Sequence, residues 1–411
     1  MAHLNRSKAH HLMQAAGLDA LIVFSPEAFA HATGAAPGVA TMWRREGAVA
    51  ALIPADPDLP ETAVVSDLFA PGFRRDSHIA DVRETAIWVE AMTLPDPDMD
   101  APAGAQFAPI WKADNRPGDN MRPETFEPMA CYRHLRDALG EKGMHAARIG
   151  VELSAVSARG YPALLDALSP ARLVDATAIA RNLRAVKSPA EIAHLRDAVT
   201  VAELGIAAVR DAVAPGIARS DLAAIWFETI AARGVGYPMT GTWEYISVGR
   251  DPWGGDATAR TGDLVKVDVG CLMNGYTSDS GRTFVLGQPS RLQADLHRSL
   301  LAGFRSGFSL LHPGVPLSEV HRATQAAIRA EGLTGYSRGH FGHGLGTGPG
   351  TEEWPFISAQ AETQIETGMV LAFECPIYVT GVGGMIIEDQ VEITDEGPVS
   401  MNTLPLDLVA C

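Results

Sequence analysis

Two segments in the C-terminal half of the chain each carry a pair of carboxylates that folding brings together. The first, residues 262–287, alternates valines before Asp268 and has an Asn274-Gly275 turn signal ahead of Asp279. Alternating apolar residues around such a turn predict two antiparallel strands. We therefore expect Asp268 and Asp279 to lie near one another in the folded chain.

The second segment, residues 369–393, places Glu374 and Glu388 symmetrically about Gly381. An antiparallel pairing that turns at Gly381 puts the two glutamates opposite each other. Residues that lie opposite each other in a sheet share one of its faces. The spacing therefore predicts a second carboxylate pair on a single sheet face.

Four carboxylates that converge on one face repel each other, and a divalent cation is the simplest way to neutralise them. His343, in the stretch GHFGHGLG, supplies a nitrogen ligand. Oxygen-rich ligation with one imidazole suits Mn, Fe, Co or Zn better than it suits a cysteine-based structural zinc site. These residues together have the layout of a two-metal site.

A single acid on a strand usually faces solvent. That interpretation fails for the set, because Ala372-Phe373 and Ile386-Ile387 make both glutamate strands look buried. A buried carboxylate without a partner is costly. The pattern therefore favours a metal centre over four unrelated surface acids.

Composition excludes several classes of protein. The chain has 411 residues, 46% of them hydrophobic, and a formal net charge of −16, which argues against binding to nucleic-acid phosphates. Histidines and charges occupy the N-terminus where a signal peptide needs an apolar core, and no apolar run reaches membrane-spanning length. Four widely spaced cysteines without a CxxC pattern fit a reducing compartment, so we expect a cytoplasmic protein.

The first part of the chain alternates helix-like and strand-like stretches. Residues 18–24 and 47–53 are apolar runs typical of buried strands, and residues 146–151 and 171–174 resemble later strands of the same domain. Residues 94–129 are dense in proline, aspartate and glycine, which predicts a long irregular surface segment that can act as a lid. We expect an α/β domain over residues 1–180.

A second domain is expected over residues 181–411. Ser188-Pro189-Ala190-Glu191 forms a capping box, which predicts a helix that Pro215-Gly216 ends. A further helix is expected over residues 220–233, and strands follow it. The similar plan of the two carboxylate segments indicates an internal duplication, with helices packed on one side of a curved sheet.

Short motifs surround every ligand candidate. Asp268 lies in VDVG, Asp279 in TSDSGRTF, His343 in GHGLG, Glu374 in AFECPIY and Glu388 in IIEDQV. With the opening AAGLDALIVFSPEAFAHATGA and the joining stretch LRAVKSPAEIAHLRDAVTVAELGI, they resemble the pita-bread metallohydrolase superfamily. This group includes prolidase, Xaa-Pro aminopeptidase, methionine aminopeptidase and creatinase, and the resemblance covers nearly the whole chain.

The resemblance implies a creatinase-type α/β N-terminal domain followed by an α+β pita-bread catalytic domain with a curved antiparallel sheet. It implies that Asp279 and Glu388 bridge two divalent metal ions, that Asp268 chelates one ion, and that His343 and Glu374 complete the other. It also implies a homodimer.

The chain departs from the family pattern at three places. The peptidases carry a histidine shortly before the first metal aspartate, but no histidine occurs here between His194 and His297. A second family histidine is absent from HGLGTGPGTEEWPF, where we expect a small insertion. Ile386 replaces the arginine usual in the last motif. These losses predict weak turnover of ordinary Xaa-Pro dipeptides.

Other polar and aromatic residues near the motifs are candidates for the missing roles, and each has a plain structural alternative. Glu374 and His340 are the expected catalytic residues, although His340 can instead only support the ligands. Polar candidates for substitutes are Arg250, Asp251, Asp256, Glu352 and Glu353, and aromatic ones are Trp243, Tyr245, Trp253 and Trp354. Among these we expect substrate contacts from Arg250, Asp251, Trp253 and Trp354.

The expected reaction is hydrolysis of a C–N bond by metal-activated water in a small-molecule or short-peptide substrate. Overall similarity favours a prolidase-like dipeptidase or aminopeptidase. The missing histidines favour a hydrolase of a small non-peptide amide, guanidine or cyclic amidine, as in creatinase- or ectoine-hydrolase-like relatives. A metal-dependent lyase and a non-catalytic binding module are more remote alternatives.

Overall fold

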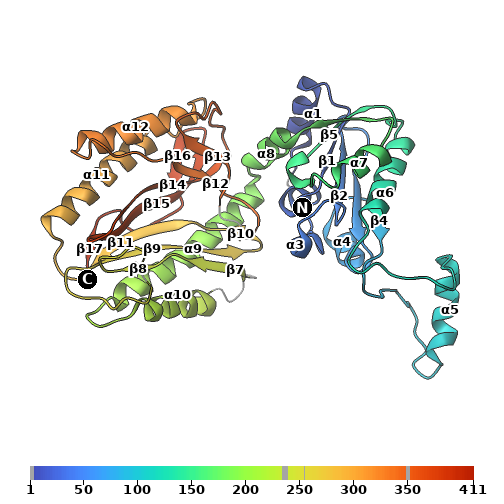
Figure 1. Cartoon of the computed structure of the whole chain (residues 1–411), viewed down its shortest axis with the longest axis horizontal. Helices are drawn as coiled ribbons and strands as arrows, with labels where there is room; N and C mark the ends of the chain where they lie inside the picture. The colour runs from blue at the N-terminus through green and yellow to red at the C-terminus, as the bar shows by residue number, and fades with distance from the viewer. Residues whose placement is uncertain (1–3, 234–238, 254, 349–351) are drawn as a thin grey trace. The chain divides into compact units, whose positions relative to one another are not determined.

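The structure is a computed structural model that describes residues 4–233, 239–253, 255–348 and 352–411. The chain forms two compact units, Met1–Leu183 and Arg184–Cys411 (Figure 1). Their boundary falls inside helix α8 (Thr177–Ala185). No helix among the described residues is both long and apolar enough to cross a membrane.

The first unit is built on a six-stranded mixed sheet with the order β4-β3-β2-β1-β5-β6. Its strands are β1 (Ala20–Val23), β2 (Ala50–Pro54), β3 (Thr62–Ser66), β4 (Asp81–Thr85), β5 (Arg148–Val151) and β6 (Arg172–Asp175). Its helices are α1 (Arg6–Ala15), α2 (Pro26–Thr33), α3 (Ala40–Trp43), α4 (Ala70–Asp76), α5 (Ala103–Ala113), α6 (Pro128–Glu141) and α7 (Tyr161–Ala167). Leu21 packs in one hydrophobic cluster and Ile22 in another, so the sheet is covered on both faces. This confirms the predicted α/β domain.

The segment 94–129 is not irregular throughout, as its composition had suggested. It contains α5, and α6 begins at its end. Helix α5 has no buried residue and stands away from the sheet of its own unit (Figure 1). Arg122 anchors the returning chain, because its guanidinium lies 2.7 Å from Asp67 Oδ2 and 3.0 Å from Glu90 Oε2. The prediction was wrong here because the alanines favour a helix in spite of Pro109 within it and the prolines around it.

The second unit contains a curved, largely antiparallel sheet whose main path is β10-β9-β11-β15-β14-β12-β13. Its strands are β7 (Met239–Glu244), β8 (Ser247–Val248), β9 (Leu264–Met273), β10 (Tyr276–Thr277), β11 (Ser280–Val285), β12 (His340–Gly344), β13 (Glu353–Ser358), β14 (Val370–Val379), β15 (Gly383–Thr394), β16 (Gly397–Ser400) and β17 (Val409–Ala410). Its helices after α8 are α9 (Pro189–Ala212), α10 (Arg219–Arg233), α11 (Arg291–Phe308) and α12 (Leu317–Ala330). The predicted capping box opens α9 through Ser188 and Glu191.

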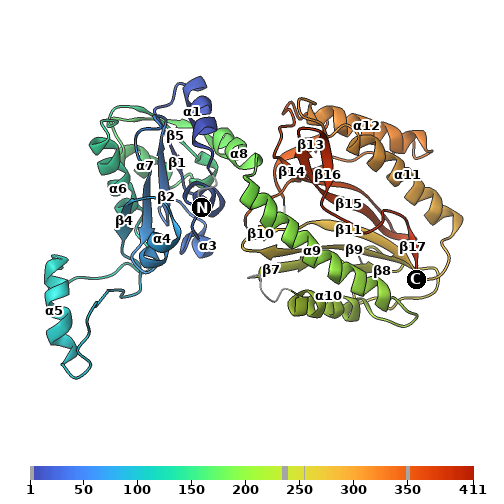
Figure 2. The same cartoon turned by 180° about the vertical axis from the view of Figure 1, so that it is seen from behind.

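Helices cover one face of this sheet (Figures 1 and 2). On β9, Val265, Val267 and Val269 share a hydrophobic cluster with Trp226 of α10. On β14, Phe373 packs with residues of α11 and α12. Because successive strand residues point to opposite faces, the residues between these positions point away from the helices. The opposite face is therefore the one that carries the predicted carboxylates.

Candidate metal centre

Asp279, His343 and Glu388 meet on the face of the second sheet that lies opposite α10, α11 and α12. One potential ligand atom from each lies within 4.8 Å of the other two, and all three residues are buried. His343 Nε2 lies 3.5 Å from Asp279 Oδ2. His343 lies on β12 and Glu388 on β15, and Asp279 immediately precedes β11, so the three residues are far apart in sequence.

The register of the strands places the remaining predicted ligands beside this group. Glu374 of β14 pairs directly with Glu388 of β15, as the symmetry about Gly381 had predicted. Gly281 of β11 pairs with both Asp268 of β9 and Glu388. Asp268, Glu388 and Glu374 therefore lie in one row across neighbouring strands and share a face.

Two glycine features of the strands make this row possible. A Cβ atom added at Gly281 would lie 2.8 Å from Glu388 Oε2, so only glycine leaves room for that carboxylate. The Asn274-Gly275 turn joins β9 to β10 with positive φ angles of 53° and 82°, which the predicted turn type requires.

His343 is held in one orientation by its other ring nitrogen. Nδ1 lies 3.0 Å from the carbonyl oxygen of Gly344. A ring that donates its Nδ1–H to a carbonyl leaves Nε2 as the acceptor, which is the form that binds a metal ion. The Nε2 atom is the one that faces Asp279.

The electrostatics of the face show that its charges are incompletely compensated. Burial raises the pKa of Asp279 well above its ordinary value, and repulsion from Asp268 and Glu374 raises it further. Burial and the neighbouring Asp279 do the same to the pKa of Glu388. Glu388 Oε2 is a buried atom without a hydrogen-bond partner among the described residues. This donor set fits a divalent cation, which would hold the carboxylates in their charged form.

Two cations outside the expected ligand set also reach the face. Lys266 Nζ lies 3.0 Å from Asp268 Oδ2, and Arg338 Nη2 donates to Glu374 Oε1 at 2.6 Å. Burial raises the pKa of Asp268 while Lys266 lowers it. The sequence could have predicted the position of Lys266, because it lies two residues before Asp268 and residues two apart on a strand share a face.

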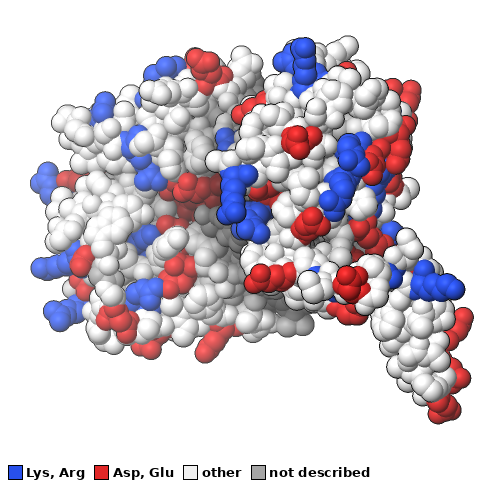
Figure 3. Space-filling model, turned by 45° about the vertical axis from the view of Figure 1, so that its right-hand side comes forward, with Lys and Arg blue, Asp and Glu red and all other residues white. Residues whose placement is uncertain are grey.

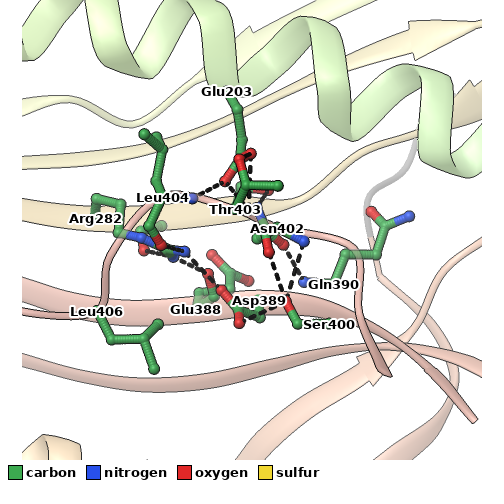
Figure 4. Close-up of polar contacts among 12 residues, drawn as sticks. Glu203, Arg282, Glu388, Asp389, Gln390, Ser400, Asn402, Thr403, Leu404 and Leu406 are labelled. Carbon is green, nitrogen blue, oxygen red and sulfur yellow. Dashed lines mark hydrogen bonds and ion pairs between the residues drawn. The ribbon is translucent and has the colours of Figure 1, made fainter. Parts of the chain in front are cut away.

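A hydrogen-bond network behind the ligands fixes β11 against β15 on the helix-covered face (Figure 4). The Arg282 guanidinium donates to the carbonyl oxygen of Glu388 at 2.5 Å and to Asp389 Oδ1 at 2.7 Å. Ser400 Oγ donates to Asp389 Oδ2 at 2.7 Å. Both charged side chains of the Arg282–Asp389 pair are buried.

The same network reaches the C-terminal segment and α9. Glu203 of α9 accepts from the backbone N–H groups of Thr403 and Leu404 at 2.8 Å each. Gln390 Oε1 accepts from the backbone N–H of Asp279 at 3.2 Å, which positions that ligand directly. Asp389 and Glu203 thus have hydrogen-bond partners within the chain.

His340 lies beside the centre. Its Nδ1 is 3.8 Å from Glu374 Oε1, and its ring centroid is 6.2 Å from that of His343. Burial lowers the pKa of His340, and the positive charge of Arg338 lowers it further. The neutral form of His340 is therefore favoured. A neutral imidazole beside Glu374 can accept a proton or donate a hydrogen bond.

The other predicted substitutes divide into exposed and structural residues. Arg250 and Asp251 are exposed, and Asp251 Oδ1 accepts from the N–H of Trp253 at 3.0 Å. Trp253 is 71% exposed and stacks on Tyr378 with ring centroids 4.7 Å apart. Trp354 packs against the hydrophobic core of the unit.

Two of the acidic substitutes have structural partners. Asp256 accepts from the N–H and hydroxyl of Ser220 at 2.7 and 2.8 Å, beside the start of α10. Glu353 pairs with Arg184. Glu352 is exposed, and its charge adds to the effect of burial in raising the pKa of Asp279. The insertion predicted after His343 falls partly outside the described residues.

Comparisons with known proteins agree with this geometry. The model of metallopeptidase family M24 matches residues 193–395. The chain is 35% identical over 252 residues to the probable dipeptidase PepE of Mycobacterium tuberculosis, covering 60% of this chain and 66% of that protein. It is 32% identical over 226 residues to the Xaa-Pro dipeptidase of Pyrococcus furiosus, covering 53% and 63%. The matched part is just under two thirds of each relative's length.

A solved structure extends the likeness to both units. The dipeptidase PepE from Mycobacterium ulcerans matches with a TM-score of 0.74 at 27% identity, covering 98% of this chain and 96% of that chain. The family match, the relatives and this structure confirm the resemblance stated from the motifs. Together these findings support the pita-bread metallopeptidase superfamily for this chain.

Proposed function

We propose that the protein is a metal-dependent dipeptidase that hydrolyses the C–N bond of short peptides. The observation that carries this proposal is the convergence of Asp279, His343 and Glu388, with Asp268 and Glu374 in the adjoining row. The dipeptidase and Xaa-Pro dipeptidase names of the relatives support a peptide substrate. An Xaa-Pro preference is the finer part of the proposal.

The ligand set we propose is Asp268, Asp279, His343, Glu374 and Glu388. The resemblance implies two ions, and the oxygen-rich donors suit Mn, Co, Zn or Fe. When bound, such ions polarise the substrate carbonyl and lower the pKa of a bound water. The chain supplies the fixed carboxylates, and the network around Arg282 keeps their strands in register.

Glu374 and His340 are the proposed proton carriers. Arg338 holds Glu374 at the end of the row formed by Asp268, Glu388 and Glu374. In this position Glu374 accepts a proton from the attacking water and delivers it to the leaving nitrogen. His340 lies 3.8 Å from the same oxygen atom of Glu374 and shares the transfer. Arg250, Asp251, Trp253 and Trp354 remain proposed substrate contacts.

The comparisons do not favour the hydrolase of a small non-peptide amide, because the matching curated relatives carry peptidase names. They do not favour the lyase or the binding module either. The missing family histidines are the one feature that supports a non-peptide substrate. A substrate panel therefore has to include both chemical classes.

The remaining proposals concern partners. We propose a cytoplasmic homodimer without a nucleic-acid partner. The net charge of −16 supports the last point, and on the face in Figure 3 basic side chains lie among acidic ones. Light scattering after size-exclusion chromatography tests the dimer, and a single monomer peak would contradict it.

The experiment that tests the function combines metal reconstitution with a substrate panel. Chelator-stripped protein is loaded with Mn²⁺, Co²⁺ or Zn²⁺ and assayed on Xaa-Pro dipeptides, other dipeptides, and creatine-like and ectoine-like amides. Metal-dependent cleavage of dipeptides supports the proposal. Cleavage confined to the non-peptide amides would overturn it.

A further inference from the structure

Residues 89–125 form an arm that leaves the first unit and returns to it (Figure 1). The two ends of the arm meet at a β-bridge between Ile87 and Phe126, where the N–H of Trp88 also donates to the carbonyl oxygen of Thr125 at 3.2 Å. The arm carries helix α5, and none of the 11 residues of this helix is buried. The chain therefore builds a helix that contributes to no core of its own unit.

The composition of α5 does not suit a helix that remains in water. Its only polar side chains are those of Gln106 and Lys112. Phe107, Ile110 and Trp111 share one face, because residues three and four positions apart on a helix are neighbours. The rings of Phe107 and Trp111 lie 6.0 Å apart, and Trp111 is 38% exposed. Apolar side chains at this spacing on an exposed helix indicate a partner surface.

Hydrogen bonds and ion pairs within the chain order the arm. Gln106 Nε2 donates to the carbonyl oxygen of Asp98 at 2.8 Å, and Gln106 Oε1 accepts from the N–H of Asp98 at 2.9 Å. After the helix, Arg116 Nη1 lies 2.7 Å from Glu90 Oε1, and Arg122 Nε lies 3.0 Å from Glu90 Oε2. A surface that is already ordered loses less conformational entropy when it binds a partner.

A second apolar surface lies at the base of the arm and is named here the root patch. Trp43 of α3 and Trp88 contact each other edge to face, with ring centroids 6.3 Å apart. Phe69 lies against Gly38, since a Cβ atom added at Gly38 would be 2.9 Å from its ring. Exposed apolar residues that gather in this way mark an interaction surface. The root patch consists of the exposed residues Met42, Trp43, Leu68, Phe69 and Trp88.

The arm and the root patch differ in charge. Residues 94–121 contain five aspartates against two basic residues, and acidic side chains lie along the outer edge of the arm in Figure 3. At the root patch, Trp43 is followed by the exposed Arg44 and Arg45. Arg44 pairs with Glu27, whereas the guanidinium of Arg45 lies 5.9 Å from the ring centroid of Trp43. An acidic arm complements a patch that carries cations, whereas two arms repel each other.

The area of the two surfaces favours a second copy of this chain as the partner. A helix of 11 residues is roughly 16 Å long and about 10–12 Å wide with its side chains, so one face covers roughly 250–300 Å². A specific interface buries at least about 1,000 Å² in total. One arm on one root patch buries about half of that area. Two copies that exchange arms form the contact twice and reach it.

We propose that the arm of one copy docks on the root patch of a second copy, and that a twofold axis repeats this contact with the roles exchanged. The apolar face of α5 then covers the root patch, and the aspartates of the arm lie beside the arginines that follow Trp43. The inference rests on the homodimer proposed above and assigns a surface to it. It depends neither on the metal centre nor on the substrate.

The first test measures the mass of the full chain in solution by light scattering and analytical ultracentrifugation. The double variant Phe107→Gln, Trp111→Gln removes the apolar face of α5, and the unit should still fold because no residue of this helix is buried. We expect the assembly to lose half its mass as its dissociation constant rises by at least about 30-fold. The control Leu165→Gln, at a side chain of the same unit that is 44% exposed, should keep the wild-type mass.

Cross-linking tests the pairing of arm with root patch. The chain's other cysteines are buried, so Cys411→Ser removes the background thiol. In this background Ala108→Cys places a thiol on the arm and Met42→Cys places one on the root patch. With a flexible bismaleimide we expect linked dimers only after the two single variants are mixed and allowed to exchange subunits. Linkage in Ala108→Cys alone, or none in the mixture, would overturn the proposal.

The mass measurement separates failure of this inference from failure of the proposed homodimer. A wild type that is monomeric at every concentration would overturn both. A dimeric wild type whose mass is unchanged in Phe107→Gln, Trp111→Gln would overturn the inference alone, because the homodimer then uses a different surface. Dipeptide turnover is a separate measurement and decides neither result.

Discussion

The two faces of the sheet in the second unit treat buried carboxylates in opposite ways. On the helix-covered face, Asp389 accepts from Arg282 and Ser400, and Glu203 accepts from Thr403 and Leu404 (Figure 4). On the other face, Asp279 and Glu388 repel each other, and Glu388 Oε2 has no hydrogen-bond partner among the described residues.

This difference separates acids that are paired within the chain from the acids that we propose as metal ligands. Glu388 and Asp389 are neighbours in sequence and are both buried, so burial alone does not distinguish their roles. What distinguishes them is whether other groups of the chain donate hydrogen bonds to both carboxylate oxygens. Adjacent residues on a strand meet different faces, so one strand serves both purposes.

The largest effect is expected from a substitution of a proposed metal ligand. Asp279→Asn keeps the size of the side chain but removes its charge, so we expect loss of bound metal and a fall in kcat/KM of roughly 10³-fold or more. In the metal-free state the same variant should be more stable than the wild type, because a buried repulsion disappears. Elemental analysis, dipeptide kinetics and urea unfolding measure the three effects. Full metal content in the variant would remove Asp279 from the ligand set.

The next largest effect is expected from a substitution on the helix-covered face. Arg282→Met leaves Asp389 as a buried charge without its cation, and we expect a loss of about 3–5 kcal/mol in the free energy of unfolding. Unlike Asp279→Asn, this variant should be destabilised with and without metal. Arg298→Met is the control, because its side chain is 56% exposed and its ion pairs are worth little. Equal losses of unfolding free energy in Arg282→Met and Arg298→Met would contradict the structural role of the buried Arg282–Asp389 pair.

A pH series sharpens the comparison without a mutation. The pKa values of Asp279 and Glu388 are raised in the folded state, so the metal-free folded protein holds protons that the unfolded chain releases. Their contribution to stability is complete below the unfolded pKa of about 4 and is lost as the pH rises through the raised values. Metal-free protein should therefore lose stability from these groups as the pH rises above the unfolded pKa of about 4, as urea unfolding measures.

Saturating Mn²⁺ should reverse this trend, because metal ligands have to be deprotonated. A metal-free Asp279→Asn, Glu388→Gln double variant should show a smaller pH slope than the wild type. An unchanged slope would assign the pH dependence to other groups.

The smallest effect on stability is expected at the edge of the ligand face. Trp253 is 71% exposed and contacts Tyr378 by stacking, so Trp253→Ala should change the free energy of unfolding by no more than about 0.5 kcal/mol. As a proposed substrate contact, it should raise KM more than it lowers kcat. An unchanged KM across the dipeptide panel would remove Trp253 from the substrate site.

Local spacing explains why much of the ligand face was predictable. The symmetry of Glu374 and Glu388 about Gly381 and the Asn274-Gly275 turn fix the strand register without any knowledge of the tertiary structure. The helix start at Ser188 was equally readable, because a capping box is a local signal.

Features that depend on distant contacts were not predictable in this way. Arg338 lies in the loop before β12, and its approach to Glu374 depends on packing such as the hydrogen bond from Tyr336 Oη to the carbonyl oxygen of Pro376. The support of Asp279 by Gln390 joins residues 111 positions apart. Helix α5 was missed for another reason, since Pro109 within it and the prolines and aspartates around it concealed its helix-forming residues.

The most direct test of the account measures bound metal and dipeptide turnover in the same preparations of wild type and Asp279→Asn. We expect metal-dependent cleavage by the wild type, and loss of both metal and turnover in a variant that still folds. A wild type that cleaves dipeptides equally well after chelation, or a variant that keeps metal and activity, would contradict the assignment of this face as a metallopeptidase centre.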